Sequence, residues 1–156
     1  MLREGKQGFG NMTAISGIIE DKGTLVLSVD EDTTVFNAIS LMAEVNVGAV
    51  LVKNENELAG IFTERDYLQK IALKSLDSRK TPVKKVMSHP VITASPGDSV
   101  QQCMEVMTRC RCRHLPVVDH NDELLGIVSI GDLVKNLLME KEFEVQQLSG
   151  YIAGSY

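Results

Sequence analysis

The chain has 156 residues, 44% of them hydrophobic and 24% charged, a length that predicts one compact domain or two small halves sharing a core. Its formal net charge of −5 at pH 7 argues against broad nucleic-acid binding, because phosphate contacts depend on clustered Lys and Arg. No apolar run reaches the roughly 18 residues that a membrane-spanning helix needs, so we expect no membrane partner. Three cysteines without CxxC spacing indicate reduced thiols and a cytoplasmic location.

Residues 1–12 lack the apolar core of a signal peptide. Because they are polar and glycine-rich, they are expected to form a flexible tail. The first half of the chain, residues 13–74, predicts a strand, a helix, two strands around a polar turn and a second helix. These elements are expected over Leu25–Val29, Thr34–Val45, Gly48–Lys53, Leu58–Phe62 and Glu64–Leu73. Helical spacing of Val35, Ile39 and Met42 indicates the buried face of the first helix.

A predicted linker at residues 75–80 separates this half from residues 81–139, which repeat the same order of elements. The second set is expected over Val91–Ala94, Ser99–Cys110, His114–Asp119, Glu123–Val128 and Ile130–Leu138. The clearest repeated words are "GIFTERD" at Gly60–Asp66 and "GIVSIGD" at Gly126–Asp132, each at the end of a hairpin. The sequence therefore predicts a β-α-β-β-α unit that occurs twice in tandem.

The strands "GAVLV" and "HLPVV" are apolar at successive positions, so both of their faces are expected to be covered. We predict an α/β (α+β) fold of two β-α-β-β-α repeats packed sheet to sheet with pseudo-twofold symmetry, plus N- and C-terminal helices. Within residues 140–156, Val145, Leu148 and Ile152 have helical spacing. This spacing predicts an amphipathic terminal helix that docks on the body or on a partner.

In each repeated motif a hydroxyl residue ends a strand and an aspartate follows three positions later, as Thr63 with Asp66 and Ser129 with Asp132. One interpretation is structural, since this spacing is nearly that of a capping box at a helix start. A functional interpretation uses the same geometry, because free N–H groups attract phosphate and an aspartate can hold the hydroxyls of a ribose. Within the functional interpretation, the glycine of each motif is expected to allow close approach to the backbone.

The segments "NVGAVLV", "LAGIFTERDY", "RCRHLPVVD" and "LLGIVSIGD" resemble the two halves of a tandem cystathionine-β-synthase (CBS) domain pair, or Bateman module. The resemblance covers nearly all of Thr13–Leu138. It implies a regulatory module without catalytic residues, a required cofactor or a metal. It also implies clefts between the halves that bind adenine nucleotides or related compounds (AMP, ATP, NAD or S-adenosylmethionine), a homodimer, and signalling to an unknown protein partner.

The family also implies which residues contact the ligand. Asp66 and Asp132 match its ribose-binding aspartates, Arg113 and His114 match a basic pair near phosphate, and the first strand of a repeat matches the adenine contacts. The expected ligand-binding residues are Thr63, Arg65, Asp66, Val91, Ile92, Thr93, Arg113, His114, Pro116, Ser129, Ile130, Gly131 and Asp132, with Leu25, Val26 and Leu27 as the alternative adenine contacts. We favour the Asp132 cleft for a mononucleotide, and leave the Asp66 cleft open to a second ligand or none.

Two other functions stay open at this point. The clefts could be vestigial, in which case the protein is an interaction adaptor that works through its terminal helix. An enzyme acting on a nucleotide is the weaker alternative, because the chain carries no phosphate-binding P-loop, no nucleophile elbow and no set of catalytic residues. Cys110 and Cys112 lack the spacing of a zinc site, and Cys103 occupies an apolar helix position that predicts a core side chain.

Overall fold

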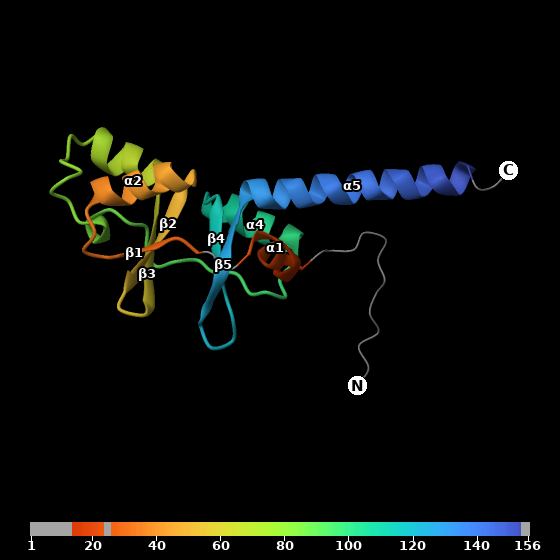
Figure 1. The fold of residues 1–156 in the computed structure, drawn as a ribbon, viewed down its shortest axis with the longest axis horizontal. Coiled ribbons are helices and arrows are strands. Elements are labelled where there is room, and N and C mark those ends of the chain that lie inside the picture. The colour runs from red at the N-terminus through yellow and green to blue at the C-terminus, as the bar shows by residue number, and fades with distance from the viewer. Residues whose placement is uncertain (1–13, 24–25, 154–156) are drawn as a thin grey trace.

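The structure is a computed structural model that describes residues 14–23 and 26–153, so the predicted tail at residues 1–12 lies outside the described residues. Figure 1 shows two similar units side by side, with one long helix running out from the second. The first half contains α1 (Ile15–Lys22), β1 (Ser28–Asp30), α2 (Val35–Val45), β2 (Ala49–Asn54), β3 (Glu57–Thr63), α3 (Glu64–Asp66) and the π-helix η1 (Tyr67–Ala72). The second half contains the 3₁₀-helix η2 (Val83–Lys85), α4 (Val100–Cys110), β4 (His114–Val118), β5 (Leu124–Ser129) and α5 (Ile130–Ala153).

The first repeat holds a three-stranded sheet in which β1 is parallel to β2 and β2 is antiparallel to β3. In the second repeat β4 and β5 form an antiparallel pair, and the predicted strand Val91–Ala94 is reduced to a single bridge between Ala94 and Val117. Pro116 explains the difference. It occupies the place of Leu51, whose N–H donates to the carbonyl of Leu27 in the first sheet, and proline has no N–H to donate.

The hairpins and the first helix of each repeat lie within a residue or two of their predicted positions. Polar side chains begin both helices: Thr34 accepts a hydrogen bond from the N–H of Asn37, and Ser99 forms a capping box with Gln102. Each such cap stabilises a helix by about 1 kcal/mol. The predicted fold class is confirmed, as two similar α/β units that differ in the first strand.

The segment that comes just before each repeat, its lead-in, packs in the apolar core of the other repeat. Helix α1 precedes the first repeat, yet Ile15 and Ile18 belong to the apolar core of the second repeat with Val117, Val128 and Leu133. In the same way, Val83 and Val86 precede the second repeat and pack in the core of the first, around Val50, Val52 and Phe62. The molecule therefore has two separate apolar clusters, tied together by exchanged segments.

The motif glycines make room for these segments. A Cβ atom on Gly60 would lie 2.4 Å from Sδ of Met87 and 3.1 Å from the backbone oxygen of Ser88, and one on Gly126 would lie 2.7 Å from Cδ1 of Ile19. Both sites are too tight for an alanine without a shift of the neighbour. The groups that approach these glycines are Met87 and Ser88 at Gly60 and the side chain of Ile19 at Gly126, each from the segment that precedes the other repeat.

Two predictions about helices are wrong. The segment predicted as an α-helix over Glu64–Leu73 has one α-helical turn, α3, followed by the π-helix η1. The helix predicted to end at Leu138 continues as α5 through residue 153, because "MEKEFEVQQL" contains good helix formers and neither glycine nor proline. The terminal segment is therefore no separate helix, and it does not dock on the body, since Val145 and Leu148 are exposed. The side chain of Ile152 lies outside the described part of the structure.

Candidate functional site at the start of α5

In the second repeated motif, Ser129 and Asp132 form reciprocal hydrogen bonds at the junction of β5 and α5. The N–H of Ser129 donates to Oδ2 of Asp132 over 2.8 Å, and the N–H of Asp132 donates to Oγ of Ser129 over 3.2 Å. The capping interpretation is therefore confirmed for this motif, and it accounts for one carboxylate oxygen. Among the described residues, Oδ1 of Asp132 receives no hydrogen bond, so it remains available to a ligand.

A lysine from α1 forms an ion pair with this aspartate. Nζ of Lys22 donates to Oδ2 of Asp132 over 2.7 Å and to the backbone oxygen of Ile127 over 2.9 Å. Burial alone would raise the pKa of Asp132, but the hydrogen bonds from Lys22 and from the backbone of Ser129 outweigh it and lower that pKa. Asp132 is consequently an anion at neutral pH, and Lys22 is a cation held against it.

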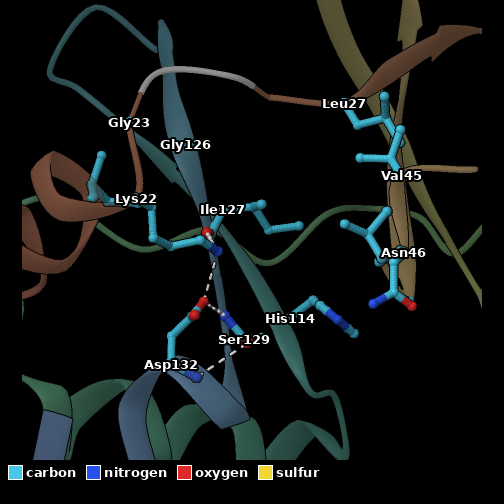
Figure 2. Close-up of a pocket in the computed structure, with 14 residues that line it drawn as sticks. Lys22, Gly23, Leu27, Val45, Asn46, His114, Gly126, Ile127, Ser129 and Asp132 are labelled. Atoms are coloured by element: carbon cyan, nitrogen blue, oxygen red, sulfur yellow. Dashed lines mark hydrogen bonds and ion pairs between the residues drawn. The ribbon is translucent and has the colours of Figure 1, made fainter. Parts of the chain in front are cut away.

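A cavity of about 350 Å³ opens beside this pair, between the two repeats. Figure 2 shows Lys22, Ser129 and Asp132 on one side and Leu27, Val45 and Asn46 on the other. Its complete lining is Ile19, Lys22, Gly23, Leu27, Val45, Asn46, Val47, Gly48, Ala49, His114, Gly126, Ile127, Ser129 and Asp132. The volume lies at the lower end of the range of small-molecule sites, about 300–1,000 Å³.

His114 lies at the start of β4 and reaches across this cavity toward Asn46 (Figure 2). Its ring is close to the opposite repeat, because a Cβ on Gly48 would lie 3.7 Å from Cε1 and Nε2 of His114. Burial, followed by the positive charges of Arg113 and Lys22, lowers the pKa of His114. The imidazole is therefore neutral at pH 7, and it offers the cavity one donor and one acceptor.

The equivalent aspartate of the first repeat is enclosed by protein groups. Asp66 is buried, and Oδ2 accepts hydrogen bonds from the N–H of Thr63 over 3.0 Å and from its hydroxyl over 3.2 Å. Oδ1 accepts one from Oγ of Ser88 over 2.9 Å and pairs with Nζ of Lys70 at 3.0 Å. Both oxygens are thus engaged, and neither Asp66 nor Thr63 lines the cavity.

One position explains why the two aspartates differ. Lys70 comes four residues after Asp66 and neutralises it from within the same helical segment. The residue four positions after Asp132 is Asn136, which carries no charge and whose buried Oδ1 has no hydrogen-bond partner among the described residues. Neutralisation of Asp132 must therefore come from another element, and α1 supplies it through Lys22 at the edge of the cavity.

Of the residues predicted to bind ligand, the structure brings His114, Ser129 and Asp132 together in this cavity with Leu27, one of the alternative adenine contacts, and leaves the other described ones outside it. Leu25 lies outside the described residues. Arg113 is exposed next to His114 in sequence, Pro116 is buried within β4, Ile130 packs on the second core and Gly131 is exposed. Arg65 is exposed, and its Nη1 lies 3.5 Å from the carbonyl oxygen of Arg111. Val91 and Ile92 line neither described cavity, while Thr93 lines a second one of about 340 Å³ with residues of α4.

Sequence reasoning missed the contributions of α1 and of the turn between α2 and β2. Lys22 and Ile19 belong to the lead-in of the first repeat, which has a loose counterpart before the second repeat. Nothing in the residue spacing indicates that this lead-in packs on the other repeat. Asn46, Val47 and Gly48 come from the segment "NVG", which aligns with the basic "RCR" at Arg111–Arg113 of the second repeat. That alignment, with the twofold relation of the repeats, is the signal that could have placed them opposite Asp132.

Metal and thiol chemistry find no support in the described part of the chain. It contains no group of three or more His, Cys, Asp or Glu side chains placed to hold a metal ion. Cys103 is buried in the second core, as predicted, and burial raises its pKa to about 11, so its thiol is inert at neutral pH. Within the same residues no helix has the length and hydropathy needed to cross a membrane.

Comparison with known proteins agrees with this architecture. Over 153 residues the chain is 39% identical to the CBS domain-containing protein CBSX3, mitochondrial, of Arabidopsis thaliana, and the match covers 92% of this chain and 74% of that protein. A solved structure of a putative signal-transduction protein with CBS domains from Burkholderia ambifaria MC40-6 superposes with a TM-score of 0.79 at 41% identity, covering 81% of this chain and 95% of that one.

A second solved structure carries a ligand. It is the CBS domain protein PAE2072 from Pyrobaculum aerophilum complexed with AMP, with a TM-score of 0.69 and 28% identity over 77% of this chain and 89% of that chain. The family description "CBS domain" matches twice, over residues 24–73 and 83–139. These ranges coincide with the two structural repeats, and the chain belongs to the CBS domain family as a tandem pair.

Proposed function

We propose that this CBS pair is a regulatory module that binds an adenine nucleotide in the cavity beside Asp132. The proposal is carried by Oδ1 of the ionised Asp132, which accepts no hydrogen bond from the described residues. This oxygen lies at the N-terminus of the 24-residue helix α5, beside a cavity of about 350 Å³ between the repeats. The AMP complex of PAE2072, a relative with the same fold, supports an adenine nucleotide as the ligand class.

The lining divides into polar and apolar parts that suit the parts of a nucleotide. Oδ1 of Asp132 accepts hydrogen bonds from ribose hydroxyls, and such bonds to a charged acceptor are about twice as strong as neutral ones. Leu27, Val45 and Val47 offer an apolar surface to the base. Lys22, His114 and the helix N-terminus are the groups that a phosphate would approach.

Lys22 has two roles in this proposal. Without ligand its ammonium group is neutralised by Asp132, so the empty cavity carries little net charge. A nucleotide brings both hydroxyl donors for the carboxylate and phosphate oxygens for the ammonium group. Binding therefore exchanges one internal ion pair for two interactions with the ligand, and the aspartate is never left unpaired.

Regulation follows from the position of the cavity. Because its lining comes from both repeats, a bound nucleotide stabilises one relative arrangement of the two over others. A partner protein or a second copy of the chain that recognises this arrangement would then respond to nucleotide concentration. The homodimer, the protein partner and the cytoplasmic location remain predictions, and the Arabidopsis relative is named as a mitochondrial protein.

Isothermal titration calorimetry with AMP, ATP, NAD and S-adenosylmethionine tests the proposal, alongside mass spectrometry of small molecules released from the purified protein. We expect one saturable site with a preference among these ligands. Absence of binding by every ligand, together with no co-purified nucleotide, would instead favour the adaptor. Chemical conversion of a bound nucleotide over hours would favour the enzyme.

A further inference from the structure

The two motif aspartates use one carboxylate oxygen in the same way and the other differently. In each motif Oδ2 accepts the N–H of the hydroxyl residue three positions earlier. At Asp132 the other oxygen, Oδ1, accepts no hydrogen bond from the described residues. At Asp66 the same oxygen is bonded to Ser88 and paired with Lys70. Oδ1 is therefore the atom that distinguishes an open motif from a closed one.

The donors at Oδ1 of Asp66 are of the kind that a nucleotide would bring. Oγ of Ser88 is a hydroxyl donor at 2.9 Å, and Nζ of Lys70 lies 3.0 Å from the same oxygen. Nζ of Lys70 also donates to the backbone oxygen of the buried Val86 over 2.9 Å. The backbone of Ser88 exchanges two hydrogen bonds with that of Ile61, over 2.8 and 3.0 Å. Both donors thus come from the protein itself, and each is held at a second point.

We propose that Lys70 is an internal occupant of the Asp66 site, and that the residue four positions after each motif aspartate decides whether the site takes a ligand. Lysine at this position closes the first site, and Asn136 leaves the second one open. The choice of a nucleotide as the ligand rests on the proposed function. The inference itself concerns two residues outside the lining of the Asp132 cavity, and it predicts one nucleotide per chain.

A ligand would displace Lys70 only at a large loss of affinity. The side chain of Asp66 is 8% exposed, so separating it from its cation leaves a buried charge without its partner. Binding that requires this step is expected to be weaker by roughly 100-fold or more. The side chain of Asp132 is 23% exposed, and Lys22 pairs with it through Oδ2. A ligand can therefore reach Oδ1 of Asp132 before any internal contact is broken.

The surroundings of the first motif suit an anionic ligand once the lysine is removed. The turn Arg111–Arg113 aligns with the turn before β2, which lines the Asp132 cavity from the other repeat. Arg65, next to the first motif aspartate, approaches this turn, because its Nη1 lies 3.5 Å from the carbonyl oxygen of Arg111. Replacement of Lys70 would thus free a carboxylate acceptor near arginine side chains, which are the groups that bind ribose hydroxyls and phosphate.

Isothermal titration calorimetry with AMP tests the inference through the number of sites. Lys70→Asn gives position 70 the residue found in the second repeat, and Lys74→Asn is the matched control at an exposed lysine four residues later. We expect one site in the wild type and in the control, and one additional site in Lys70→Asn. Adding Asp66→Asn to Lys70→Asn should remove the additional site. No additional site in a Lys70→Asn protein that thermal unfolding shows to be folded, or two sites in the wild type, would overturn the inference.

The reciprocal change is Asn136→Lys, which tests the same rule in the second repeat even where Lys70→Asn destabilises the first. The added ammonium group is expected to pair with Oδ1 of Asp132 and to weaken AMP binding roughly 10- to 150-fold. Asn136→Met has a similar length without the charge and should keep the wild-type affinity. Equal affinity in all three proteins would contradict the rule.

Failure of the proposed function gives a different result from failure of this inference. If the Asp132 cavity binds no nucleotide, the wild type shows no AMP site. The comparison of Lys70→Asn with the wild type still decides the role of Lys70, because a site gained by that variant supports the internal occupant and the absence of a gain refutes it.

Discussion

Replacing Asp132 with asparagine separates the charge of this residue from its role as a helix cap. The oxygen of the new side-chain amide still accepts the N–H of Ser129, so the start of α5 is preserved. The change removes the charged acceptor for ribose hydroxyls, and hydrogen bonds to charged groups contribute about 1.5–3 kcal/mol. We therefore expect the affinity for adenosine to fall roughly 10- to 150-fold.

A smaller loss is expected for AMP than for adenosine, and the reason is Lys22. In the wild type this lysine is neutralised by Asp132 at 2.7 Å, whereas in Asp132→Asn its full charge is available to a phosphate. Part of the lost ribose binding is thus offset when a phosphate is present. Calorimetry with both ligands measures the two losses, and equal losses would show that Lys22 does not meet the phosphate.

The matched control is Asp66→Asn, the same change in the other repeat. Asp66 is buried and bonded to Thr63, Ser88 and Lys70, so its charge is expected to contribute to stability and not to ligand binding. A loss of about 1.5–3 kcal/mol lowers the unfolding midpoint by roughly 3–12 °C in a chain of this size, with ligand affinity unchanged. Unchanged affinity in Asp132→Asn, or an equal loss in both variants, would refute the ribose assignment.

Three further predictions concern neighbouring residues. Lys22→Ala should reduce the preference for AMP over adenosine in calorimetry, while costing at most about 1 kcal/mol of stability because the ion pair is partly exposed. The lowered pKa of His114 leaves the imidazole neutral, and a bound phosphate would favour its protonated form. AMP affinity should therefore rise as pH falls from about 8 to 6, and His114→Asn should flatten that profile. Gly60→Ala should cost about 1–3 kcal/mol in denaturant unfolding, since the new Cβ meets Met87 and the backbone of Ser88, and a stability equal to wild type would contradict the close packing.

The hairpins and the helices that begin near Thr34 and Ser99 were predictable because local signals agree there. Polar turns, apolar runs and capping residues each point to the same element, and each is encoded within a few positions. The repeat of Gly60–Asp66 in Gly126–Asp132 added the order of elements and the likeness of the two halves. Agreement between local patterns and an internal repeat was thus sufficient for the fold class.

What could not be predicted depends on contacts between distant segments. The missing strand near Val91 results from the absent N–H of Pro116, and that requires knowing which strand lies beside it. The ion pair of Lys22 with Asp132 joins residues 110 positions apart, because α1 packs on the second repeat. Periodicity describes which face of α1 is apolar, but not which core that face joins.

The packing of α1 on the second repeat determines which charged side chain lies beside Asp132 at the cavity. Had α1 packed on its own repeat, Lys22 would lie far from Asp132, and the carboxylate would need a partner within α5, where Asn136 offers no charge. As built, the cation sits on α1, while Gly23 and Leu27 of the chain that follows also line the cavity. Under the proposed function, a ligand that draws Lys22 away from Asp132 would act on α1, which is packed in the second core. Because the cavity is lined by both repeats, its occupancy would be coupled to both of them through a single lysine.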